Sequence, residues 1–87
     1  MEVKNLNGYK NQFLITDKEK TVFQSYDYKI AEFNNETNTL KIYSEWSYSN
    51  TTMRHFKAFI NTHTTFNYEN KAQWIKEIKN NNNIEVQ

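Results

Sequence analysis

The hydrophobic pattern of this 87-residue chain changes its period near residue 49. Before that point apolar and aromatic residues alternate with polar ones, as they do in strands, and after it they recur every three or four residues, as they do in helices. A chain of this length has room for one hydrophobic core. We therefore expect a single α+β domain over residues 1–87, with its strands first and its helices last.

Four strands are predicted in the first half of the chain, at residues 11–17, 21–26, 28–33 and 39–46. The clearest hairpin joins the last two, because the Asn-rich segment 34–38 between them is typical of a turn and asparagine tolerates a positive φ. In the strand after this turn, Leu40 and Ile42 alternate with polar or amphipathic residues. The strands are expected to form an antiparallel meander.

Two helices are predicted at residues 51–63 and 68–79. Ser49 or Asn50 would cap the first, and Asn67 or Asn70 the second, because these side chains accept hydrogen bonds from the free amides of a first turn. Both helices are long enough to cover one face of the sheet, which gives the order ββββαα.

The tail at residues 80–87 is expected to be frayed, because four asparagines end the second helix. An edge strand through Ile84 and Val86 is the alternative for this segment.

The composition argues against an enzyme. The chain has no cysteine and one glycine, which leaves no thiol chemistry, no disulfide and no glycine-rich phosphate loop. Its two histidines, His55 and His63, lie eight residues apart, about 12 Å along a helix, which is too far to share a metal. We therefore expect no catalytic residues, no metal and no cofactor.

No segment approaches the roughly 20 apolar residues of a membrane span. The first ten residues are polar and lack the apolar stretch of a signal peptide. The sequence therefore predicts a cytoplasmic protein without a membrane partner.

The chain contains six phenylalanines, six tyrosines and two tryptophans, more than one thin core is expected to bury. The surplus candidates are Tyr26, Tyr28, Tyr43, Trp46 and Tyr48. Exposed tyrosine and tryptophan are typical of binding hot spots, although cross-strand aromatic pairs also stabilise sheets.

From this surplus we predict a partner-binding patch beside the start of the first helix. Its predicted members are Tyr43, Trp46, Tyr48, Arg54 and Lys57. The partner would be a host protein or ribonucleoprotein, and an unprotected sheet edge leaves a homodimer as a further option.

A nucleic-acid-binding module is the alternative interpretation. No acidic residue lies between Trp46 and Tyr68, and the start of a helix favours phosphate. The residues that would contact nucleic acid are Thr51, Thr52, Arg54, His55, Lys57 and Lys71. A net charge of +1 is small for such a protein.

Several short motifs resemble a family of small uncharacterised proteins from phages, plasmids and other mobile elements of low-GC Gram-positive bacteria. The motifs are Val22-Phe-Gln-Ser-Tyr26, Ile30-Ala31, Trp46-Ser-Tyr-Ser-Asn-Thr-Thr52, Phe56 and Phe59, and they span roughly residues 20–60. The resemblance implies a mobile-element accessory protein in a bacterial host and transfers no catalytic residues. By analogy with other small phage proteins, it suggests an inhibitor of a host defence protein, such as a CRISPR-Cas effector.

Overall fold

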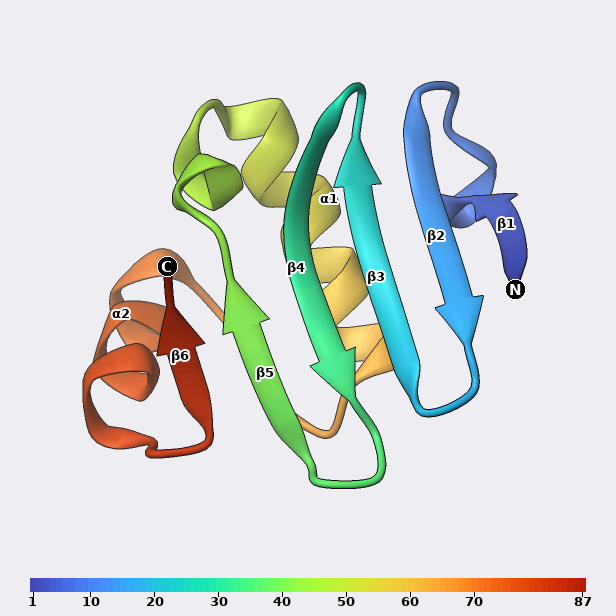
Figure 1. Ribbon diagram of the computed structural model, residues 1–87. Coiled ribbons are helices and arrows are strands. Elements are labelled where there is room, and N and C mark those ends of the chain that lie inside the picture. The colour runs from blue at the N-terminus through green and yellow to red at the C-terminus, as the bar shows by residue number, and fades with distance from the viewer.

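The computed structural model describes residues 1–87 and shows a six-stranded sheet in the order β1-β2-β3-β4-β5-β6 (Figure 1). The strands are β1 (Glu2–Asn5), β2 (Gln12–Asp17), β3 (Lys20–Ser25), β4 (Tyr28–Asn34), β5 (Thr39–Ile42) and β6 (Ile84–Val86). Neighbouring strands are antiparallel except for β5 and β6, which are parallel. The α+β class is confirmed, and the four predicted strands correspond to β2 to β5, but the sheet is larger than expected because each edge of the meander gains a strand.

The two additional strands lie at opposite edges of the sheet. All four residues of β1 are exposed, so this strand has no alternating apolar pattern by which it could be recognised. In β6 only Ile84 is buried, opposite Leu40 of β5. The tail is therefore not frayed, and the edge-strand alternative for Ile84 and Val86 is the correct one.

The strand predicted at residues 39–46 ends early, at Ile42. A short 3-10 helix, η2 (Ser44–Ser47), follows it and turns Trp46 into the core, where 9% of this side chain is exposed. The alternating pattern continues past Ile42 in the sequence, but the chain must leave the sheet there to reach the first helix.

Two helices follow, α1 (Asn50–His63) and α2 (Lys71–Asn80). Ser49 caps α1 by accepting from the amide of Thr52 at 3.1 Å, as predicted. Asn70 caps α2 in the same way, accepting from the amide of Gln73 at 2.9 Å.

The second helix begins three residues later than predicted. Tyr68 lies in the connection before it, where the side chain of Asn61 bonds both the amide and the carbonyl of Tyr68, at 2.7 and 2.9 Å. This pairing holds the backbone in a non-helical conformation and places the Tyr68 ring in the core, 5% exposed.

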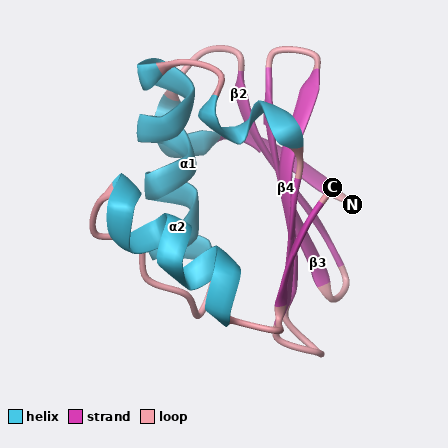
Figure 2. Cartoon of the chain, turned by 90° about the vertical axis from the view of Figure 1, so that its left-hand side faces the viewer, coloured by secondary structure: helices cyan, strands magenta, loops and turns pink.

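Both helices pack on one face of the sheet (Figure 2). Fifteen buried apolar residues from the sheet, η2, the helices and the connections form one cluster. Phe56 lies at its centre, with its ring centroid 5.3 Å from that of Trp46, 6.0 Å from that of Tyr68 and 5.7 Å from that of Trp74. Aromatic rings from η2, α2 and the connection between the helices thus pack around the ring of Phe56.

Candidate functional site

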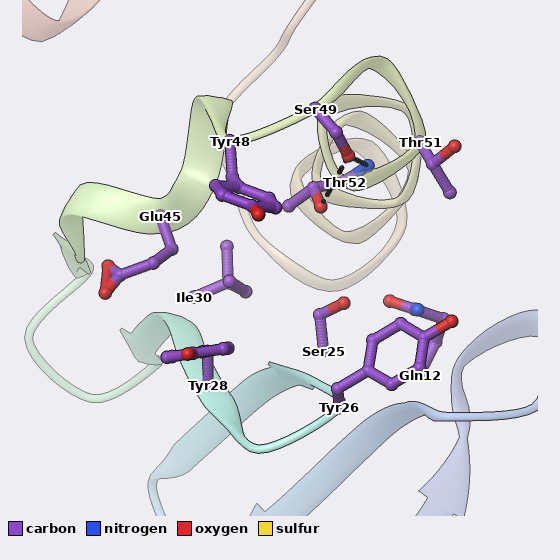
Figure 3. A pocket seen from close by; sticks show the side chains of 10 residues that line it. All are labelled: Gln12, Ser25, Tyr26, Tyr28, Ile30, Glu45, Tyr48, Ser49, Thr51 and Thr52. Carbon is purple, nitrogen blue, oxygen red and sulfur yellow. Dashed lines mark hydrogen bonds between the residues drawn. The ribbon is translucent and has the colours of Figure 1, made fainter.

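A pocket of about 550 Å³ opens at the end of the sheet where the β3–β4 turn faces η2 and the first turn of α1 (Figure 3). The elements around it are held in place by the burial of Trp46 below η2 and by the Ser49 cap of α1. We call it the tyrosine pocket, after the tyrosines in its lining: Tyr26, Tyr28 and Tyr48.

These tyrosines are unusually exposed for large aromatic side chains. Tyr26 and Tyr28 are each 60% exposed, and Tyr48 is 83% exposed. In Figure 3 the rings of Tyr28 and Tyr48 lie on opposite sides of Ile30. The pocket is therefore a slot with an aromatic ring on each side and an apolar floor.

The turn that carries Tyr26 has a constrained backbone. Tyr26 has a φ of 54°, a left-handed conformation that is uncommon for a bulky residue. Its amide donates to the carbonyl of Asn11 at 2.7 Å, and its carbonyl accepts from the side chain of Gln24 at 2.8 Å. Such strain is found at binding sites, where the surrounding structure maintains it.

A β-bulge forms the floor of the pocket. Phe23 pairs with Ala31 and Gln24 pairs with Lys29, so Ile30 is the additional residue of β4. Both Ile30 and Ala31 are consequently buried, although alternation would place one of them on each face. Both residues belong to the core cluster, and the bulge additionally brings Ile30 into the lining of the pocket.

Glu45 is the only charged residue in the lining of the pocket. One of its carboxylate oxygens accepts from the hydroxyl of Ser44 at 2.6 Å. The start of α1 contributes a partial positive charge, but the amide of Thr52 already donates to the hydroxyl of Ser49. The tyrosine pocket therefore has a negative formal charge.

Gln12 lies at the opposite end of the pocket from Glu45 (Figure 3). The residue is 3% exposed, and its Oε1 has no hydrogen-bond partner. A buried amide oxygen without a partner costs free energy, so this group marks a position where the fold has left an acceptor unsatisfied.

Replacing Gln12 with methionine is expected to raise the free energy of unfolding by about 1 kcal/mol, because the apolar side chain has a similar shape and removes the unsatisfied oxygen. Urea unfolding followed by circular dichroism measures the change. Gln24→Met is the matched control, and it should lower stability because the Gln24 amide donates to the carbonyl of Tyr26. A less stable Gln12→Met protein would show that the amide is satisfied.

The histidines lie outside the pocket. His55 is 4% exposed with its ring centroid 4.6 Å from that of Tyr9, and His63 packs against Phe59. Burial, and then the charge of Arg54, lowers the pKa of His55 below its usual 6.5. Burial, and then the charge of Lys4, lowers the pKa of His63. His55 is buried because the N-terminal segment around Tyr9 covers it.

These pKa values predict that the protein loses stability in mild acid. Between the lowered pKa of each folded histidine and about 6.5, the unfolded chain binds more protons than the folded one, so the free energy of unfolding falls as the pH falls through this window and is constant just above it. Urea midpoints between about pH 5 and 8 test this. The double variant His55→Gln, His63→Gln should lose this pH dependence, and an unchanged slope would assign it to other groups.

The predicted partner-binding residues are only partly brought together. Tyr48 lines the pocket, but Trp46 is buried in the core, and Tyr43 is half-buried with the Lys29 ammonium 5.5 Å from its ring centroid. Arg54 and Lys57 are exposed on α1 and are not among the pocket-lining residues. The expectation of an exposed Trp46 is wrong because η2 turns it inward.

The residues of the nucleic-acid alternative are also dispersed. Thr51 and Thr52 line the pocket. Thr52 and His55 are both buried, so they offer little surface to a phosphate backbone. The ammonium of Lys57 donates to the carbonyl of Glu69 at 3.0 Å, and Lys71 lies on α2.

Gln12 and Glu45 were not predicted as binding residues, and Tyr26 and Tyr28 were recognised only as surplus aromatics. The pair of tyrosines around a single aspartate, Tyr26-Asp27-Tyr28, is the sequence signal that points to the β3–β4 turn.

No helix is long and apolar enough to cross a membrane, and no three His, Cys, Asp or Glu side chains are grouped as metal ligands would be.

The chain belongs to a family of unknown function, DUF8033, whose model matches residues 1–77. The match includes every residue of the tyrosine pocket. No curated protein and no solved structure matches the chain.

Proposed function

We propose that this member of DUF8033 is a non-enzymatic binding protein that captures a protein partner through the tyrosine pocket. The observation that supports this most directly is the slot formed by Tyr28 and Tyr48 over Ile30. Tyrosine provides rigid contact area at little entropic cost and is enriched in the residues that dominate binding energy.

The chemistry of the pocket lining also favours binding over catalysis. Its hydroxyl groups belong to Ser25, Ser49, Thr51, Thr52 and the tyrosines, and none of them lies beside a histidine or lysine in the lining that could act as a base. The Ser49 hydroxyl is already engaged at the cap of α1.

The charge of the pocket supports a protein partner over a nucleic acid. Its single formal charge is the carboxylate of Glu45, which repels phosphate, whereas nucleic-acid sites neutralise phosphates with lysine and arginine. The exposed Arg54 and Lys71 belong to different helices and lie outside the pocket lining.

The resemblance to mobile-element proteins supports a more specific form of the proposal. In this form the partner is a host macromolecule, such as a CRISPR-Cas effector or another defence protein in the bacterial cytoplasm, and binding inhibits it. Purified protein would then reduce the activity of that effector at a fixed stoichiometry, and a variant without the pocket tyrosines would not.

The double variant Tyr28→Ala, Tyr48→Ala is expected to lose partner capture while remaining folded, because both rings are largely exposed and contribute little to the core. Two hot-spot tyrosines are together worth several kcal/mol of binding, so we expect a loss of at least about 100-fold in affinity. Affinity capture from a lysate of the source organism, with and without nuclease treatment, measures it.

Tyr43→Ala is the matched control, since this tyrosine lies nearby, between β5 and η2, but is half-buried under Lys29 and outside the pocket lining. It should capture the partner normally. Capture that survives the double variant, or that disappears on nuclease treatment, contradicts the proposal.

A further inference from the structure

The geometry points to a specific ligand chemistry for the tyrosine pocket: we propose that it receives an arginine side chain of the partner protein. This inference rests on the proposed function and deepens it. The guanidinium would lie between the rings of Tyr28 and Tyr48, with Glu45 as its counter-ion.

The first argument is charge. Glu45 is the only charged residue in the lining, and no lysine, arginine or histidine balances it there. Glu32, in the neighbouring strand β4, is by contrast paired with Lys20 and Lys29, at 3.5 Å each, while Asp17 and Glu85 of the sheet form no salt bridge, as Glu45 does not. The Glu45 carboxylate has only the neutral hydroxyl of Ser44 as a partner. It is therefore available to a cation from outside.

The second argument is shape. Tyr28 and Tyr48 lie on opposite sides of Ile30 and are not in ring contact with each other, so a flat group can enter between them. The faces of aromatic rings attract cations, and a guanidinium is planar and stacks on such faces, which an ammonium does not. A guanidinium also presents paired donors to a carboxylate.

The third argument is the unsatisfied acceptor at the other end. Gln12 is 97% buried, and its side-chain amide points into the pocket in Figure 3. Its Oε1 has no partner within the chain. An arginine reaching Glu45 brings the backbone of its own segment along the pocket, and a small rotation of the buried Gln12 side chain would let an N–H of that segment donate to its Oε1. The pocket thus offers acceptors at both ends and an aromatic, apolar middle.

Citrulline provides the decisive comparison, because it has nearly the shape of arginine without the charge. We expect N-acetyl-arginine N-methylamide to shift the backbone amide resonances of residues 26–28 and 45–49 in titrations of the ¹⁵N-labelled protein, with a millimolar Kd. The citrulline analogue should bind at least about tenfold more weakly, since it lacks the cation–π and charge-assisted contacts. Equal binding of the two compounds would overturn the proposal.

Glu45→Gln tests the counter-ion. This variant should have a smaller preference for arginine over citrulline, because the cation–π contacts with Tyr28 and Tyr48 remain but the counter-ion is lost. Glu36→Gln, which removes an exposed carboxylate from the β4–β5 turn at the other end of β4, should retain the full preference. A preference that is undiminished in Glu45→Gln would assign the selectivity to another group and overturn the role of Glu45. A short single-stranded oligonucleotide that shifts the same resonances at lower concentration would assign the pocket to nucleic acid instead.

The failure of this inference can be distinguished from the failure of the proposed function. If Glu45→Gln captures the partner normally and the double tyrosine variant does not, the pocket is the binding site but does not select a cation. If both variants capture normally, the tyrosine pocket is not the binding site and both proposals fail.

Discussion

Replacing Phe56 with alanine is expected to lower the free energy of unfolding by about 3–5 kcal/mol, the range typical of a large aromatic side chain removed from a core. Phe56 is fully buried, and its ring contacts those of Trp46, Tyr68 and Trp74. Its loss would open a cavity bordered by η2, α1, α2 and the connection between the helices. Because these rings are large and rigid, they cannot collapse into the space.

A protein of this size has a total stability of about 4–13 kcal/mol, so Phe56→Ala should remove roughly a quarter or more of it and shift the unfolding midpoint accordingly. Thermal and urea unfolding, with near-ultraviolet circular dichroism as a probe of ring packing, measure the effect. Phe13→Ala is the matched control, because Phe13 is only half-buried in β2 and is outside the core cluster. A similar loss from both substitutions would contradict the central position assigned to Phe56.

The second large effect concerns the C-terminal edge of the sheet. Ile84→Ala is expected to cost about 2–4 kcal/mol, because Ile84 is 7% exposed and joins the core cluster opposite Leu40. Backbone hydrogen bonds from Leu40 to Asn83 and from Gln87 to Ile42, both 2.8 Å, hold the strand in place. Loss of Ile84 removes the one side chain that anchors β6.

Val86→Ala provides the comparison, since Val86 occupies the same strand but is 48% exposed. It should change stability by less than about 1 kcal/mol. Hydrogen exchange adds a local measurement: the amides of Leu40 and Gln87 should exchange faster in Ile84→Ala than in Val86→Ala. Equal protection in the two variants would mean that β6 is held by its backbone alone.

The substitutions at Phe56 and Ile84 should differ in their effect on the tyrosine pocket. Phe56 supports Trp46, and Trp46 supports η2, which carries Glu45 and leads directly to Tyr48. Substitutions in this part of the core should therefore weaken partner capture through loss of fold. β6 lies at the far edge of the sheet from the β2–β3 side of the pocket, so Ile84→Ala should retain capture wherever the protein is still folded (Figure 1).

Local signals in the sequence were sufficient for the inner strands and for most of both helices. The alternation in β2 to β5 follows from the two faces of a sheet, and the caps at Ser49 and Asn70 follow from the free amides of a first helical turn. These signals depend on residues close together in the chain. They can therefore be recognised in the sequence without knowledge of the fold.

The pocket could not be predicted in the same way. Gln12, Tyr28 and Glu45 come from three separate elements, and only the antiparallel order of β2 to β5 places them around one opening. Trp46 and Tyr48 are two residues apart with similar local patterns, yet one is 9% and the other 83% exposed. The turn of η2 determines which of the two side chains is buried, and that turn depends on the position of α1.

The sequence by itself determined the α+β class, the change from strands to helices near residue 49 and an excess of aromatic side chains. These follow from the period of the hydrophobic pattern and from the composition, which are both properties of the chain alone. The tertiary structure alone decided which rings are exposed, that β1 and β6 complete the sheet and that Gln12 lacks a partner. The physical reason is that burial and hydrogen-bond satisfaction depend on contacts between residues distant in the chain. Edge strands such as β1 depend on backbone pairing, which leaves no side-chain pattern to read.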